Sequence, residues 1–130
     1  GASSTDALAF GGYDSTQRTY TETWNGSAWT ELNDLNTARE TAGSLGTSTA
    51  ALYVGGYTGS FVGVTEDWNG ASWAEVADLS TARAYSLAGG GTTTAGFVAG
   101  GQTASGGANK TAATEEWSGS SVATKTVDTD

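Results

Sequence analysis

The sequence contains no cysteine, no histidine and no proline. Without cysteine there is no disulfide bond, no thiolate nucleophile and no thiolate metal site. Without histidine the chain lacks the most frequent general base and the most frequent transition-metal ligand. These absences exclude Ser-His-Asp and Cys-His triads and argue against zinc, copper and haem chemistry. We therefore expect no cofactor, no metal site and no catalytic residue.

Positive charge and long apolar runs are also scarce. The 130 residues include 14 acidic and 5 basic side chains, which gives a formal net charge of −9. An acidic surface repels phosphate backbones and anionic lipids, so we expect neither nucleic acid nor a membrane as a partner. No run of apolar residues is long enough to predict a membrane-spanning helix. Residues 1–10 lack the basic and apolar regions of a signal peptide.

What the sequence does contain is a repeat. A Gly-Gly doublet recurs after 44 and then 45 residues, each doublet is followed by a Glu-x-Trp segment, and Thr-Ala-Arg occurs twice. A period near 44 residues is typical of a propeller blade of four short strands. The repeated positions are Gly11, Gly12, Gly55, Gly56, Gly100 and Gly101 in the doublets, Glu22, Glu66 and Glu115 with Trp24, Trp68 and Trp117 in the next segments, then Trp29, Trp73, Arg39 and Arg83.

Strands can be placed within each repeat. The apolar runs 50–54 and 95–99 predict inner strands that are buried on both faces. The alternating segment that follows ends in Trp-Asn-Gly, which predicts a tight type I′ hairpin within 24–29 and 68–73. Segments 39–45 and 83–88 predict the innermost strand of the following blade.

The strand count predicts an all-β fold and an open array. We expect about three four-stranded blades with about eleven strands, in a single partial β-propeller over 1–130 with repeats at approximately 1–36, 37–80 and 81–130. The first repeat begins at its second strand, and the last strand is expected to end near Val127. Three blades do not close a propeller, and open arrays expose strand edges. The expected partner is therefore either the rest of a longer chain or other copies of this one.

The order of the motifs resembles the kelch repeat. Val54-Gly55-Gly56-Tyr57 and Asn36-Thr37-Ala38-Arg39 are similar to the glycine doublet and the Thr-Ala-Arg-like loop of that family. Kelch repeats usually have a longer loop before the second tryptophan. The compact Thr-Glu-x-Trp-Asn-Gly-x-x-Trp form looks like the kelch-like repeats of structural and tail proteins of marine bacteriophages, and this resemblance implies a location in a virion or outside the cell.

The repeated glutamates and arginines predict structural ion pairs. Each glutamate lies two residues before a tryptophan, on a strand face expected to pack between blades, and a buried carboxylate needs a partner. The alternative is general acid or base catalysis, but an active site is needed once, whereas a strut is needed in every blade. Because no arginine follows Glu115, we expect its partner to be missing or to come from another segment.

The tryptophans and the loop carboxylates have two interpretations each. Repeated tryptophans predict cross-strand packing between blades, and sugar stacking is the alternative. Calcium binding requires several oxygens within one loop, and no Asp-x-Asp-x-Asp-Gly string occurs. The loop carboxylates considered are Asp14, Asp34, Asp78, Asp128 and Asp130.

The third repeat departs from the other two repeats. Val122 stands in place of tryptophan and Ser118 in place of asparagine. The segment 102–110 is longer than its counterpart and is either a solvent loop or part of a binding face.

Three functions fit these features. The first is a structural part of a virion appendage, such as a tail fibre or capsid-surface propeller. The second is a cellular kelch-type recognition module, either lectin-like for a cell-surface glycan or protein-binding. The third is an enzyme on a kelch-like propeller, for which the copper ligands would be missing. We predict the first, because fold alone does not determine function and the phage-like repeat is the more specific feature.

Overall fold

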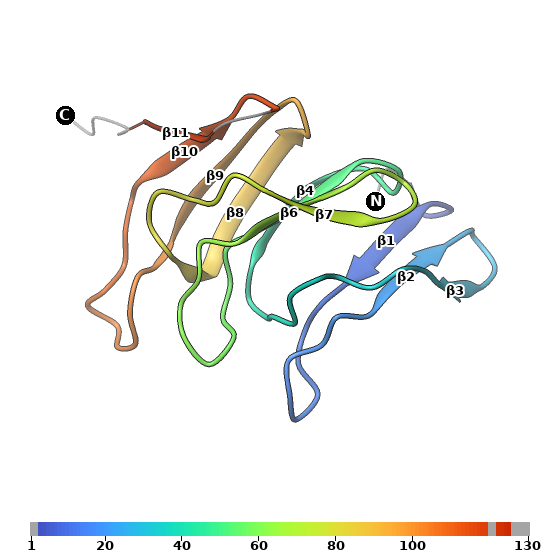
Figure 1. Cartoon of the computed structure of the whole chain (residues 1–130), viewed down its shortest axis with the longest axis horizontal. Coiled ribbons are helices and arrows are strands. Elements are labelled where there is room, and N and C mark those ends of the chain that lie inside the picture. The colour runs from blue at the N-terminus through green and yellow to red at the C-terminus, as the bar shows by residue number, and fades with distance from the viewer. Residues whose placement is uncertain (1–2, 120–121, 126–130) are drawn as a thin grey trace.

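The computed structural model describes residues 3–119 and 122–125, which form three antiparallel sheets (Figure 1). Sheet 1 contains β1 (Ala7–Phe10), β2 (Thr21–Trp24) and β3 (Trp29–Glu31). Sheet 2 contains β4 (Gly43–Gly46), β5 (Ala51–Val54), β6 (Thr65–Trp68) and β7 (Trp73–Val76). Sheet 3 contains β8 (Ala84–Thr92), β9 (Ala95–Gln102), β10 (Thr114–Trp117) and β11 (Val122–Lys125). The prediction of an all-β fold is confirmed.

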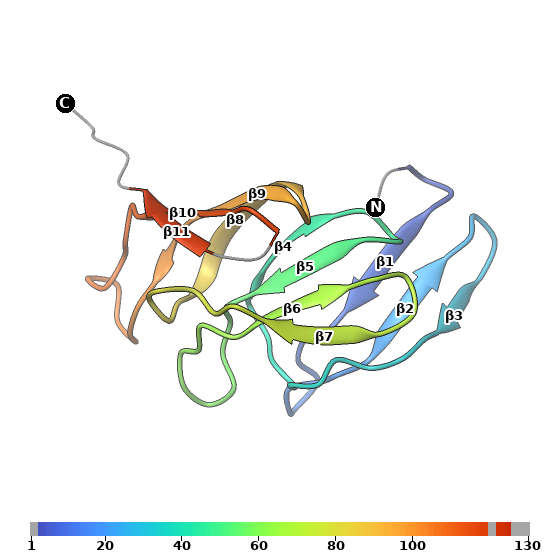
Figure 2. The ribbon, with the colours of Figure 1, turned by 45° about the horizontal axis from the view of Figure 1, so that its top comes forward.

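Each sheet is a meander in which strands that follow one another in the chain are paired. Trp24 lies opposite Trp29 in sheet 1, and Trp68 lies opposite Trp73 in sheet 2. The same register therefore recurs from sheet to sheet. Sheet 1 begins at the strand equivalent to β5, so the described residues contain no counterpart of β4 in that sheet. Figure 2 shows the sheets following one another in chain order without closing into a ring.

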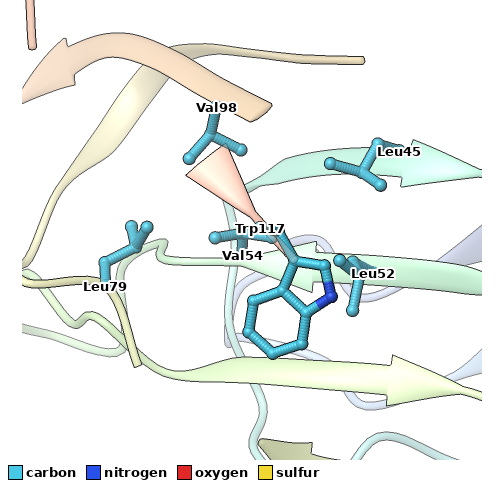
Figure 3. Close-up of a cluster of buried hydrophobic side chains, with 6 residues drawn as sticks. All are labelled: Leu45, Leu52, Val54, Leu79, Val98 and Trp117. Carbon is cyan, nitrogen blue, oxygen red and sulfur yellow. The ribbon is translucent and has the colours of Figure 1, made fainter. Parts of the chain in front are cut away.

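The two faces of sheet 2 pack against different neighbours, because successive side chains of a strand point to opposite faces. Tyr53 belongs to the cluster shared with sheet 1, whereas Leu52 and Val54 belong to the cluster shared with sheet 3. Figure 3 shows the second cluster, in which Trp117 lies among aliphatic side chains. The first cluster comprises Leu35, Ala51, Tyr53, Trp68 and Trp73, and the second comprises Leu45, Leu52, Val54, Leu79, Val98 and Trp117.

The predicted burial of both inner strands is correct for β5 and wrong for β9. All four residues of β5 are buried. In β9, Val98 is 3% exposed, but its neighbour Phe97 is 45% exposed. Phe97 points away from sheet 2, and no further described sheet covers that side. The innermost strand of sheet 2 also begins later than predicted, at Gly43 rather than at residue 39.

The hairpin prediction was wrong in turn type. The Asn25 N–H donates to the Ala28 carbonyl, so the central residues of the turn are Gly26 and Ser27. Only Gly26 has a positive φ, at 93°, whereas a type I′ turn requires positive φ at both central positions. The Asn25 side-chain oxygen instead accepts hydrogen bonds from the N–H groups of Ser27 and Ala28. The turn is therefore held by the side chain of Asn25, which immediately precedes the two central residues.

The expected strand end near Val127 and the carboxylates Asp128 and Asp130 lie outside the described residues. In the described part of the chain, no helix is long and apolar enough to cross a membrane.

The second glycine doublet is a point of close backbone approach. The Gly56 N–H donates to the Arg83 carbonyl at 2.9 Å, and a Cβ at Gly55 would lie 2.5 Å from the same oxygen, at a φ of 67°. We expect Gly55→Ala to lower the free energy of unfolding by about 3 kcal/mol, through strain and the clash together. Gly59→Ala is the control, because Gly59 has a φ of 106° but open space around its Cβ position.

Urea denaturation measures both variants. The control should lose about 1 kcal/mol, which is the backbone term alone. Equal losses in the two variants would mean that the approach of Arg83 does not constrain Gly55.

Candidate functional site

Two linkers carry the chain from one sheet to the next. The first linker, residues 32–42, joins β3 to β4, and the second linker, residues 77–83, joins β7 to β8. Each contains a buried leucine followed by Asn or Ser, then Thr-Ala-Arg. The Leu35 N–H donates to the Thr19 carbonyl, and the Leu79 N–H donates to the Gly63 carbonyl, both at 2.9 Å. These bonds anchor each linker to the sheet that it leaves, while its arginine reaches the sheet that follows.

The first linker forms a buried ion pair with sheet 2. Arg39 Nη2 lies 3.2 Å from Glu66 Oε2, and both side chains are 0% exposed. The other carboxylate oxygen accepts hydrogen bonds from the backbone N–H of Asn36 at 2.7 Å and from its side-chain nitrogen at 2.9 Å. Arg39 also donates to the Tyr53 carbonyl and lies over the Tyr53 ring, with Cζ 4.7 Å from the centroid. We call the group Asn36, Arg39 and Glu66 the first joint.

The second linker repeats this arrangement with sheet 3. Arg83 Nη2 lies 2.6 Å from Glu115 Oε2, and the Ser80 N–H donates to Oε1 at 2.7 Å. Arg83 Nη1 donates in addition to the carbonyls of Gly100 and Ala113. We call the group Ser80, Arg83 and Glu115 the second joint.

Of the two outcomes expected for Glu115, the missing partner is wrong, because Arg83 in the second linker pairs with it. Each arginine pairs with a glutamate that comes later in the sequence, because the linker runs forward onto the next sheet. The glutamate left without an arginine is consequently Glu22, in sheet 1. The nearby Arg18 pairs with Asp14 instead. Glu22 is exposed, and no ion pair joins it to any residue in 3–119.

The joints contain buried charges, so breaking either joint costs free energy. Burial lowers the pKa of the Arg39 guanidinium below its ordinary value, and the Glu66 carboxylate opposes this shift. Burial raises the pKa of Tyr53, so its phenol stays neutral and donates a hydrogen bond to the Arg39 carbonyl. Removing one member of a buried pair leaves the other charge uncompensated, at a cost of about 3–5 kcal/mol. The joints therefore hold neighbouring sheets in one arrangement.

The tryptophans of sheets 2 and 3 pack between sheets. Trp68 and Trp73 lie with ring centroids 5.3 Å apart, and Trp73 Nε1 donates to Thr21 Oγ1 of sheet 1 at 2.9 Å. Trp117 is buried against sheet 2. Trp29 of sheet 1 differs, since it is 50% exposed. The sequence pattern could not distinguish the environments of Trp29 and Trp73, because these two tryptophans occupy equivalent repeat positions.

The loop carboxylates do not converge. Asp14 pairs with Arg18 and raises the pKa of that guanidinium, and Asp34 accepts a hydrogen bond from Thr19 Oγ1. Within the part of the chain that the structure describes, no group of three or more carboxylates is placed to hold a metal ion.

An aromatic cluster at the loop end of sheets 2 and 3 was missed by the sequence reasoning. Tyr57 and Phe61 come from the loop between β5 and β6, and Tyr85 comes from the start of β8. Their ring centroids lie 5.5 to 5.9 Å apart. All three side chains are half-buried, and Tyr85 adopts a φ of 54°, which is unusual for a bulky residue. The aromatic residue after each of the first two glycine doublets, Tyr13 and Tyr57, was the available signal.

Comparison with known proteins supports the fold only. No protein family and no curated protein matches the chain. Among solved structures, that of YjhT is similar with a TM-score of 0.73 over 94% of this chain, at 12% sequence identity. The chain spans 43% of the length of the YjhT chain. The likeness therefore shows a shared all-β arrangement of antiparallel sheets and carries no function with it.

The joints can be tested by removing one charge. We expect Glu66→Gln to lower the free energy of unfolding by about 3 kcal/mol or more, because Arg39 then remains buried without its counter-charge. Glu22→Gln makes the same change at the exposed equivalent position and should alter stability by less than about 0.5 kcal/mol. Urea denaturation of both variants measures the difference. Similar effects at the two positions would contradict a structural role for the first joint.

Proposed function

We propose that this chain is a structural and binding module made of kelch-like β-propeller blades, and that it is not an enzyme. The joints are the observation that carries this proposal. Of the three repeated glutamates that acid or base catalysis could use, Glu66 and Glu115 are buried and bonded to a linker, and Glu22 is exposed. A substrate could reach neither Glu66 nor Glu115. Joints that recur at successive sheets suit a scaffold, which needs the same contact at every step.

Within that class, we propose a place in a virion appendage, such as a tail fibre or a capsid-surface propeller. The compact form of the repeat, with six residues from the first tryptophan to the second, resembles phage structural repeats. The formal net charge of −9 favours solubility and disfavours contact with nucleic acid. A chain without cysteine also keeps the same covalent structure inside and outside a cell.

Labelling of intact particles tests this proposal. An antibody raised against the chain should bind the surface of virus particles purified from the natural source, and antibody pre-absorbed with the chain should not. Denaturing mass spectrometry of the same particles should find this sequence in a polypeptide well above 13.0 kDa if further blades belong to the same chain. A mass of 13.0 kDa would favour assembly of copies. Detection in cell fractions and never in particles would contradict a virion location.

A second candidate is a cellular kelch-type recognition module, lectin-like or protein-binding. The aromatic cluster of Tyr57, Phe61 and Tyr85 favours it, because half-buried rings offer flat apolar surface for stacking with little loss of side-chain entropy. Loops held by a rigid scaffold are also the usual location of binding residues. The cluster joins two sheets, so the second joint sets its geometry.

A matched pair of tyrosine variants tests recognition. On an array of cell-surface glycans, the chain should bind at least one glycan, and Tyr57→Ala should weaken that binding about tenfold through loss of ring stacking. Tyr13→Ala is the control, because Tyr13 follows the first glycine doublet, is 59% exposed and lies outside the cluster. Equal losses in both variants, or the absence of any bound glycan, would count against a lectin-like role.

A further inference from the structure

The open face of sheet 1 has the same design as a face that is buried in sheet 2. Glu22 lies opposite Ala9 as Glu66 lies opposite Tyr53, so the two glutamates occupy equivalent positions. Likewise, the Trp24–Trp29 pair, with ring centroids 5.5 Å apart, corresponds to the Trp68–Trp73 pair at 5.3 Å.

The two faces differ in what covers them. Trp73 is 6% exposed and Glu66 is 0% exposed, whereas the equivalent Trp29 is 50% exposed and Glu22 is exposed. The two faces have the same register and the same residue types. The difference in exposure therefore arises because sheet 1 covers this face of sheet 2, whereas no described sheet covers the equivalent face of sheet 1. Sheet 1 therefore presents an acceptor surface that the described residues leave uncovered.

Two components cover the equivalent surface of sheet 2, and both come from the chain that precedes β4. Phe10 of β1 packs on Trp73 with ring centroids 4.8 Å apart. The first linker then supplies the Asn36 N–H and the Arg39 guanidinium to Glu66. The second joint repeats the polar component with Ser80 and Arg83. An apolar strand face and a Leu-x-Thr-Ala-Arg linker thus form one matching unit.

We propose that the face of sheet 1 centred on Glu22 and Trp29 binds a further blade of the same repeat, whose Leu-x-Thr-Ala-Arg linker places its arginine on Glu22. The carboxylate and the exposed indole are complementary to the guanidinium and apolar strand that this unit carries. The inference rests on the proposed role as part of a larger blade array.

A second copy of the described residues does not supply this arginine. Arg39 and Arg83 are 0% exposed and are held in their own joints, and Arg18 pairs with Asp14. A copy could offer one of the joint arginines only by breaking the joint. The occupant is therefore a blade whose linker lies outside residues 3–119.

Adding a linker to sheet 1 tests the proposal. In the extended chain, a copy of residues 32–47 directly precedes Ser4 and replaces residues 1–3. The junction preserves the register, because the Ser4 carbonyl accepts the Trp24 Nε1–H as the Ser48 carbonyl accepts the Trp68 Nε1–H, both at 3.0 Å. The extension should raise the melting temperature by about 4 °C or more.

A double-mutant cycle then assigns the gain to the ion pair. Glu22→Gln should cancel most of the increase, and Arg39→Gln in the added copy alone should do the same without a further loss when the two are combined. Glu31→Gln is the control, because Glu31 lies directly opposite Glu22 and its equivalent in sheet 2, Glu75, is exposed and is not the ion-pair partner of Arg39. An increase that survives the loss of the arginine, or equal effects at Glu22 and Glu31, would overturn the proposal.

A peptide measurement covers the case in which the extended chain does not fold. A synthetic peptide of residues 32–47, added to the unextended chain, should shift the NMR resonances of Glu22 and Trp29. The peptide with Arg39→Gln should bind at least about tenfold more weakly. Equal binding of the two peptides would refute the proposal. The proposal would also be refuted if the unextended chain self-associates and Trp29→Lys abolishes this association, because a second copy would then be the occupant. Neither result affects particle labelling or glycan binding, so the two proposals fail separately.

Discussion

A buried arginine and a buried glutamate tie each linker to the sheet that follows it, and the stacking of the sheets depends on this contact. Desolvation of two charges is costly, so the pair is stable only where further hydrogen bonds hold both groups. The backbone N–H of Asn36 or Ser80 does this for the carboxylate. The linker therefore follows a path across the sheet face that keeps both charges paired, and this path joins the two sheets.

The sheets themselves are too small to be stable alone. Most strands have four residues, and a sheet of that size needs an apolar neighbour on each face. Among the sheets that the described residues form, only sheet 2 has two such neighbours, and its β5 is buried throughout. Sheets 1 and 3 each have one, which leaves Trp29 and Phe97 about half exposed. Equivalent residues at an end of the array and in its middle can therefore differ in environment alone, as Trp29 and Trp73 do.

The proposed scaffold role separates stability from binding. The repeated carboxylates of sheets 2 and 3 are engaged inside the array, whereas the loops at the sheet ends remain free to vary. Tyr57, Phe61 and Tyr85 meet at one of these ends, although Tyr85 is distant in the sequence. Rigid positioning of loop residues by joints elsewhere is a general way to build a recognition surface, and it is compatible with a role in a particle.

The sequence alone determined the repeat period, the all-β class, the order of the strands and the residue types that pair at the joints, because these depend on spacing along the chain. Only the tertiary structure decided which glutamate each arginine meets, since the linker could have run forward or back. It also decided the turn type at Asn25, which depends on where the side-chain oxygen bonds, and the exposure of Trp29 and Phe97. Equivalent residues in a repeat carry the same local signal, but burial is a property of the neighbouring sheet.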